Sequence, residues 1–163
     1  MTDTTLYFMC GKMAAGKSTL ARQLAHEMQS LLWVQDDFLA ALFPGEIASI
    51  ADYVRCSGRL KDALGPRVAD LLSRDVSMVL DFPANTRNQR KWFRQLIDDT
   101  GVRHEMHFLD APNDVCKRQL RQRSATLPPG APWTSDEEFD AITAYFEEPA
   151  ADEGFTVIRH ARA

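Results

Sequence analysis

Eight consecutive residues combine glycine, lysine and serine in a spacing that binds phosphate. Gly11 and Gly16 are separated by four residues, and Lys17 and Ser18 follow directly, which is the P-loop pattern. Glycines let backbone N–H groups approach phosphate oxygens closely, while the lysine reaches the β- and γ-phosphates and the serine hydroxyl holds Mg²⁺. We expect a nucleotide site formed by Gly11, Met13, Ala14, Ala15, Gly16, Lys17, Ser18, Thr19 and the more distant Arg123.

The segments on either side of this loop fit the strand and helix that a P-loop requires. Residues 6–10 form a short apolar run that is typical of a buried parallel strand. After the loop, Leu20, Leu24 and Met28 recur four residues apart and predict the apolar face of a helix. A helix that begins here would direct its positive dipole end at a bound phosphate.

Three carboxylates follow predicted strands and are candidates for catalysis and metal binding. Asp36 and Asp37 end the predicted strand 31–35. A carboxylate there can accept the proton of an attacking hydroxyl, or it can cap the following helix. We favour Asp36 as the base and expect Asp37 to contact the substrate. Asp81 ends the predicted strand 76–81 and is expected to hold Mg²⁺ through water or through Ser18; the alternative is a carboxylate that binds loop N–H groups.

Arginines crowd the predicted helix 113–123. Arg118 and Arg121 are three residues apart and share a helix face, from which they could neutralise the oxygens of a phosphoryl group in transfer. The alternative is a solvated basic face. The proline-rich segment that follows, about residues 124–134, is predicted to be a mobile lid.

Three further residues are candidate substrate contacts. Asn85 and Arg90 follow Asp81 closely, and Asn85 is expected either to cap the next helix or to contact the substrate. Arg55 on the predicted helix 50–73 could face the acceptor, or it could form surface salt bridges with the neighbouring acidic residues Asp52 and Asp62.

Composition limits the class of protein. The chain has 163 residues, which favours one domain, and it is 45% hydrophobic and 26% charged, as in ordinary globular proteins. No apolar run approaches the ~20 residues of a membrane span, and the N-terminus has no basic region typical of a signal peptide. The formal net charge of −4 argues against a protein that coats nucleic acid.

The cysteines and histidines show no pattern of a metal or catalytic site. The three cysteines are far apart and lack metal spacing, so we expect reduced thiols in a cytoplasmic protein. The four histidines form no recognisable triad or ligand cluster, and we expect them to be structural.

Strand and helix patterns alternate along the whole chain. Further helices are predicted from Thr86 to about Gly101 and at 135–147, and further strands at 102–110 and 155–158. Five strands joined by helices imply a parallel α/β sheet with right-handed crossovers. The carboxyl ends of its strands would gather the P-loop and the acidic residues at one edge.

Taken in order, these motifs resemble P-loop kinases of the zeta-toxin, chloramphenicol phosphotransferase and polynucleotide 5′-kinase type. The resemblance covers nearly the whole chain and is carried by the P-loop, the Asp pair, Asp81, Asn85 with Arg90, Leu-Asp-Ala-Pro at 109–112 and the basic helix. It implies a three-layer fold with sheet order 2-3-1-4-5, helices on both faces and a small lid. It also implies ATP as donor, Asp36 as base and lid arginines among residues 118–123.

One departure from the polynucleotide kinases bears on the acceptor. Those proteins carry an arginine shortly after the Asp pair, whereas residues 38–42 of this chain are apolar. A smaller or less charged acceptor is therefore favoured. Within the group, the chain most resembles bacterial proteins called AAA family ATPases.

The sequence thus predicts a kinase that uses ATP and Mg²⁺ to phosphorylate a hydroxyl of a small molecule. Lys17, Asp36, Arg118 and Arg121 are its expected catalytic residues. One alternative is a nucleotide-binding module that hydrolyses ATP slowly and signals through lid closure. The other is a kinase for the 5′-hydroxyl of nucleic acid, which the net charge and Leu39 disfavour.

Overall fold

The computed structural model describes residues 3–126 and 134–162. Within them, the chain forms a five-stranded sheet whose neighbouring strands pair in parallel, in the order β2-β3-β1-β4-β5. The strands are β1 (Thr5–Gly11), β2 (Leu31–Val34), β3 (Met78–Asp81), β4 (Arg103–Asp110) and β5 (Val157–Ala161). The α/β fold and the 2-3-1-4-5 order implied by the resemblance to P-loop kinases are confirmed.

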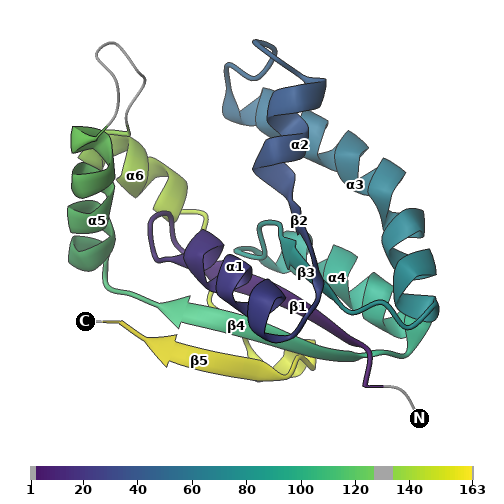
Figure 1. The fold of residues 1–163 in the computed structure, drawn as a ribbon. Coiled ribbons are helices and arrows are strands. Elements are labelled where there is room, and N and C mark those ends of the chain that lie inside the picture. Colours follow the sequence, from purple (N-terminus) through teal and green to yellow (C-terminus); the bar gives the residue numbers. More distant parts are fainter. Residues whose placement is uncertain (1–2, 127–133, 163) are drawn as a thin grey trace.

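Helices connect the strands and cover both faces of the sheet (Figure 1). They are α1 (Lys17–Glu27), α2 (Gln35–Leu42), α3 (Ile50–Ser73), α4 (Arg87–Thr100), α5 (Asn113–Ala125), α6 (Asp136–Thr143) and the short 3-10 helix η1 (Ala151–Glu153). The long helix α3 continues through Gly65 and Pro66. Side-chain caps begin three helices, because the hydroxyls of Ser49, Thr86 and Ser135 accept backbone N–H bonds from Asp52, Gln89 and Glu138.

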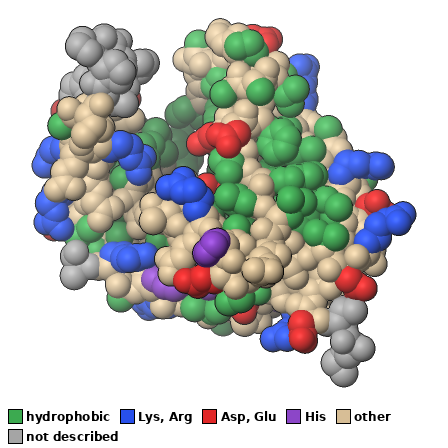
Figure 2. All heavy atoms as spheres, in the orientation of Figure 1, with side chains coloured by type: hydrophobic (Ala, Val, Ile, Leu, Met, Phe, Trp, Pro, Cys, Tyr) green, Lys and Arg blue, Asp and Glu red, His purple; other side chains and the backbone are tan. Residues whose placement is uncertain are grey.

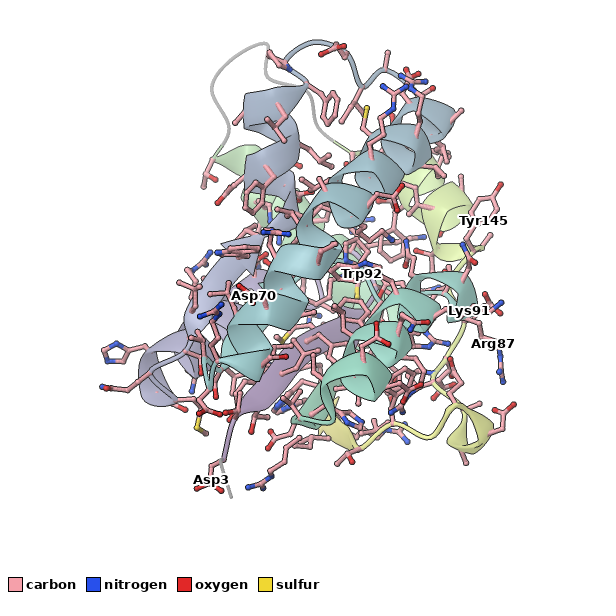
Figure 3. The ribbon with its side chains drawn as sticks, turned by 90° about the vertical axis from the view of Figure 1, so that its right-hand side faces the viewer. Asp3, Asp70, Arg87, Lys91, Trp92 and Tyr145 are labelled. Carbon is pink, nitrogen blue, oxygen red and sulfur yellow. The ribbon has the colours of Figure 1, made fainter. Side chains whose placement is uncertain are left out.

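Successive residues of β1 point to opposite faces of the sheet and divide the core in two. Leu6 and Phe8 pack with residues of α3 and α4 on one face, while Tyr7 and Met9 pack with residues of α1, α5 and α6 on the other. Every residue of β1 is buried, as is typical of a central parallel strand. Seen from the side, α3 and α4 lie next to each other, with Trp92 of α4 near α3 (Figure 3). The three cysteines are buried and form no disulfide.

Several predicted boundaries were wrong for reasons visible in the pairing of the strands. β2 is an edge strand that pairs with β3 over residues 31–34 alone, and α2 begins at the next residue. The helix predicted to reach residue 147 ends at Thr143, because the chain turns and the Glu147 N–H donates to the Asn85 carbonyl at 2.8 Å. β5 spans 157–161 instead of 155–158, since its register follows β4. Met28, predicted on the buried face of the first helix, is 48% exposed.

Two groups of helices rise above the carboxyl edge of the sheet. In Figure 1, α2 and the beginning of α3 stand on one side of the P-loop, and α5 and α6 stand on the other. The space-filling view shows a hollow between the two groups, with acidic side chains toward the α2 side and basic ones toward the α5 side (Figure 2). In the described part of the chain, no helix combines the length and apolar character needed to cross a bilayer.

Candidate active site

The P-loop joins β1 to α1 at the centre of this edge. Gly16 immediately precedes α1 with a φ of 104°, a conformation that strains residues with a Cβ atom. Gly11 ends β1 where a Cβ atom would lie 3.1 Å from the carbonyl oxygen of Leu109. Glycine at both positions therefore lets the loop curl against β4 and leaves the N–H groups of the first turn of α1 available to an anion.

Lys17 lies inside the curl of the loop. Its ammonium donates to the carbonyls of Gly11 and Lys12, at 3.1 Å for Lys12. Burial lowers the pKa of Lys17, and the charges of Asp81 and Asp36 oppose that shift. A partly desolvated cation beside free helix N–H groups suits the phosphates of a nucleotide, so the residues present fit that ligand.

Ser18 and Asp81, the two residues predicted to hold Mg²⁺, meet across the sheet edge. The Ser18 hydroxyl donates to the Asp81 carboxylate at 2.8 Å, because β3 is the neighbour of β1 and ends beside the P-loop. This pair of oxygen donors fits Mg²⁺, which keeps several waters and takes other ligands from phosphates. In the described residues, no group of three or more His, Cys, Asp or Glu side chains could hold a metal without such added ligands.

Asp36 and Asp37 lie in the first turn of α2, not at the end of a strand. The residue that precedes α2 is Val34, and no side chain caps the helix, so the capping alternative is wrong for both acids. The Asp36 side chain is exposed at the cavity but partly desolvated by its neighbours; this desolvation and the negative charge of Asp81 raise its pKa, Lys17 lowers it, and Asp37 raises it further. Asp36 therefore lies within electrostatic reach of the P-loop lysine and of Asp81.

A cavity of about 410 Å³ opens beside Asp36, between α2 and α3. Its lining residues are Asp36, Leu39, Ala40, Phe43, Pro44, Gly45, Ile47 and Tyr53. Behind it, the buried Gln35 amide donates to the hydroxyls of Tyr53 and Ser57, at 2.8 and 3.2 Å. Sequence analysis missed this cavity and Tyr53, although the i, i+4 spacing of Tyr53 and Ser57 on one helix was a usable signal.

Asn85 supports the P-loop. Its side-chain oxygen accepts the Gly11 N–H at 2.9 Å, and its own N–H donates to the Gln89 side chain at 2.9 Å. The helix cap is the neighbouring Thr86, so the capping alternative for Asn85 is wrong. The contact with Gly11 joins the loop after β3 to the first residue of the P-loop.

The substrate-binding role predicted for Arg90 requires correction. Arg90 is fully buried, pairs with Glu153 of η1 at 2.7 Å, and donates to the carbonyls of Ala84 and Glu147 at 3.0 and 2.9 Å. These contacts tie α4 to the segment between α6 and β5. With no exposed surface, Arg90 cannot meet a substrate in this conformation.

Arg55 also lies outside the site. It pairs with Asp52 at 3.0 Å on the surface of α3, which is one of the salt bridges considered as the alternative. The helical spacing places Arg55 two residues from Tyr53, on a different helix face from the cavity. The expectation that it contacts the acceptor gains no support.

The basic helix α5 faces α6 and the hollow. Arg121 pairs with Asp136 at 2.5 Å, and Lys117 pairs with Asp140 at 2.9 Å. Arg118 and Arg123 are exposed and form no ion pair within residues 3–126 and 134–162. Most of the predicted lid, residues 127–133, lies outside the described residues, and residues 124–125 belong to α5.

Two of the four histidines form a cluster with Glu105 that sequence analysis missed. His107 bonds to His160 at 2.8 Å and to Glu105 at 3.0 Å. Glu105 and His107 are two residues apart and share a face of β4, and His160, whose register partner is Leu109, lies diagonally across on β5. The cluster is distant in sequence from the P-loop and touches none of the predicted catalytic residues.

The comparisons with known proteins agree with this geometry. A family model described as an AAA domain matches residues 6–149, a range that includes the P-loop, the acidic residues and α5 and α6. The chain belongs to this AAA domain family. A comparison with curated proteins finds no match.

Solved structures show that the AAA domain of this chain has the fold of P-loop kinases. A proposed kinase of Chloroflexus aurantiacus is 20% identical with a TM-score of 0.76, over 99% of this chain and 86% of that chain. A gluconokinase of Sinorhizobium meliloti is 15% identical with a TM-score of 0.63, over 98% and 84%. Chaetomium thermophilum Kti12, solved with ADP-AlF3, is 15% identical with a TM-score of 0.69, over 96% and 88%.

Proposed function

We propose that this protein transfers the γ-phosphoryl group of ATP to a hydroxyl of a small molecule. The observation that carries the proposal is the position of Asp36. Its pKa responds to both Lys17 and Asp81, and its side chain also lines an open cavity. A candidate base thus lies between the phosphate site and a space for an acceptor, which a protein that only binds nucleotide does not need.

The P-loop side of the site would hold the donor. Backbone N–H groups of residues 16–19 and the Lys17 ammonium would bind the phosphates, and Ser18 and Asp81 would hold Mg²⁺. When bound, Mg²⁺ would supply positive charge to the β- and γ-phosphate oxygens. Lys17 would leave its carbonyl partners in the loop and extend to the same oxygens.

The α2 side of the site would hold the acceptor. Asp36 would orient the acceptor hydroxyl and take its proton as the oxygen attacks phosphorus. The raised pKa of Asp36 improves the match between this carboxylate and a hydroxyl proton. Asp37, in the same exposed turn, would contact the polar edge of the acceptor.

The lid side would supply positive charge. Arg118 and Arg123 are exposed on α5 and form no ion pair among the described residues, and in a closed lid they would reach the phosphate oxygens. Arg121 would have to exchange Asp136 for phosphate as the lid closes. Arginines placed in this way stabilise the charge spread over a transferring phosphoryl group.

Incubation with ATP labelled in the γ-phosphate, Mg²⁺ and pools of metabolites, antibiotics and 5′-hydroxyl oligonucleotides tests the proposal. We expect label in an organic product made by the wild type and absent with Lys17→Ala. Label that appears only in inorganic phosphate, for every pool, would contradict the proposal and favour slow hydrolysis. Label in the oligonucleotides would move the function to a nucleic-acid kinase.

A further inference from the structure

We propose that the acceptor is an uncharged alcohol with an apolar body, held in the cavity between α2 and α3 and hydrogen-bonded to Tyr53. The inference rests on the proposed function and names its substrate class. It concerns one wall of the site, from the first turn of α2 to the beginning of α3. Three observations lead to this substrate class: the apolar lining of the cavity, the charges around it, and the hydroxyl proton of Tyr53.

The wall of the cavity is almost entirely apolar. Leu39, Ala40, Phe43, Pro44 and Ile47 supply it, and Asp36 and Tyr53 are the polar side chains among the lining residues. The cavity has a volume of about 410 Å³ and is open to solvent on one side; apolar walls with a few placed polar groups are the lining that small-molecule sites use. A ligand with a hydrocarbon or aromatic body would bury surface against this wall and present one polar end to Asp36.

Charge around the cavity disfavours an anionic acceptor. Asp36 lines it; burial and the negative charge of Asp81 raise the pKa of Asp36, Lys17 opposes that shift, and Asp37 adds to it. No lysine or arginine is among the lining residues, and Arg55 on the nearby turn of α3 is paired with Asp52. A carboxylate or phosphate on the part of the acceptor held against this wall would meet like charge, with no cation among the lining residues to compensate it.

A smaller cavity at the end of β4 differs from the cavity beside Asp36 in the charges of its lining residues. It measures about 210 Å³ and contains Lys12 together with Asp110 and Glu148. Its lysine already donates to the Ala111 carbonyl at 3.4 Å. A mixed charged lining of this kind suits ionic ligands, whereas the cavity beside Asp36 combines an acid with hydrocarbon.

Tyr53 adds a directional contact. Its oxygen accepts a hydrogen bond from the Gln35 amide at 2.8 Å and lies beside the Ser57 hydroxyl, and rotation of the phenol O–H can direct its proton to an acceptor atom in the cavity. Burial and the charge of Asp36 raise the pKa of Tyr53 to about 12, so the phenol keeps that proton at neutral pH. A neutral oxygen of the acceptor, such as an ether, a carbonyl or a second hydroxyl, is the partner this donor requires.

The reaction with such an acceptor balances without any further reagent. The alcohol O–H bond breaks and its proton passes to the Asp36 carboxylate. The alcohol oxygen forms a bond to the γ-phosphorus of ATP, and the bond between that phosphorus and the β–γ bridging oxygen breaks. The products are a phosphate monoester and ADP.

A matched pair of variants tests the charge argument. Ala40 and Ala41 are both exposed on α2, and only Ala40 lines the cavity. With ATP and Mg²⁺, initial rates are measured by mass spectrometry for neutral probes, phenylethanol and longer arylalkanols, and for their ring-carboxylated counterparts and gluconate. Ala40→Arg should lower kcat/KM for the neutral alcohols about 10-fold. It should therefore also lower the ratio of kcat/KM for the neutral alcohols to kcat/KM for the anionic probes. Ala41→Arg should stay within about two-fold of the wild type.

Tyr53→Phe tests the hydrogen bond. It should raise KM about 10-fold for neutral alcohols that carry a second oxygen and leave KM unchanged for plain arylalkanols. Equal effects on both sets of alcohols would contradict the assigned contact. Preferred use of the carboxylated probes by the wild type, or equal rates for Ala40→Arg and Ala41→Arg, would overturn the acceptor class while the proposed function stands.

A binding measurement tests the class of acceptor separately from phosphoryl transfer. If no alcohol is phosphorylated, the proposed function fails, and saturation-transfer NMR with phenylethanol still reports on the cavity. Signals that disappear in Ala40→Arg and persist in Ala41→Arg would support an apolar, uncharged ligand. Saturation-transfer signals that are absent from the wild type, or equal in the two variants, would overturn the assignment of an apolar, uncharged ligand to this cavity.

Discussion

Replacement of Asp36 by asparagine removes the proposed base and changes little else. The amide has the same shape and cannot take the acceptor proton. Loss of a general base costs about 10²–10⁴ in rate, and a 10³-fold loss of kcat corresponds to about 4 kcal/mol. Because the substitution also removes one negative charge near Lys17 and Asp81, we expect ATP to bind at least as tightly as in the wild type.

Because the pKa of Asp36 is raised, the wild type and Asp36→Asn should differ in how kcat depends on pH. Burial and the charges of Asp81 and Asp37 lift that pKa above its ordinary value of 3.8 against the opposing charge of Lys17. Wild-type kcat should therefore fall as the pH falls through the raised pKa, and Asp36→Asn should lose this acidic limb. The raised pKa also links Asp36 to the stability of the fold. Its contribution to the free energy of unfolding is present below pH 3.8, where the carboxyl is protonated, and is lost as the pH rises through the pKa of Asp36 in the folded protein. Asp36→Asn should thus be at least as stable as the wild type at neutral pH.

Single-turnover transfer, nucleotide titration and thermal unfolding measure these three effects on the same samples. Asp37→Asn is the matched control, because Asp37 lies in the same turn of α2. If Asp37→Asn loses activity and Asp36→Asn does not, the two acids have exchanged roles. Near-normal kcat in both variants, with the acidic limb retained, would refute general-base catalysis from this helix.

Three further expectations follow from contacts of single side chains. Lys17→Ala should abolish nucleotide turnover, measured as ADP release, while the thermal midpoint stays close to that of the wild type, because the side chain contacts only loop carbonyls; wild-type turnover would remove the P-loop assignment. Double replacement of Arg118 and Arg121 by alanine should lower kcat about 10³-fold, and a change below two-fold would leave α5 a solvated basic face. Arg90→Ala should lower the free energy of unfolding by about 3–5 kcal/mol in urea titrations, because Glu153 loses a buried partner; a loss of activity without a loss of stability would restore the substrate-binding role for Arg90.

The nucleotide half of the site could be predicted because its information is local. The P-loop, its strand and its helix are contiguous, and the glycines, Lys17 and Ser18 act through backbone geometry that the spacing alone specifies. The contact of Ser18 with Asp81 also followed, since both lie at the carboxyl edge of the sheet and the resemblance placed β3 beside β1.

The acceptor half was harder to predict because it depends on packing between distant segments. Arg90 has the sequence context of a site residue, and only the fold places Glu153 beside it, 63 residues away. The cavity next to Asp36 exists because α2 begins at Gln35 and packs on α3, and the length of an edge strand is weakly encoded. The cluster of His107 with His160 needs the register of β4 against β5, which no pattern within either strand indicates.

The fate of the γ-phosphate in one turnover tests the central claim most directly. Protein in excess over γ-labelled ATP is mixed with Mg²⁺ and a neutral alcohol that the screen selects, and label is followed in the alcohol and in inorganic phosphate. We expect most of the label on the alcohol with the wild type, and neither product at a comparable rate with Asp36→Asn. Label that passes to inorganic phosphate at the same rate with and without the alcohol, and equally in both proteins, would contradict phosphoryl transfer to an acceptor.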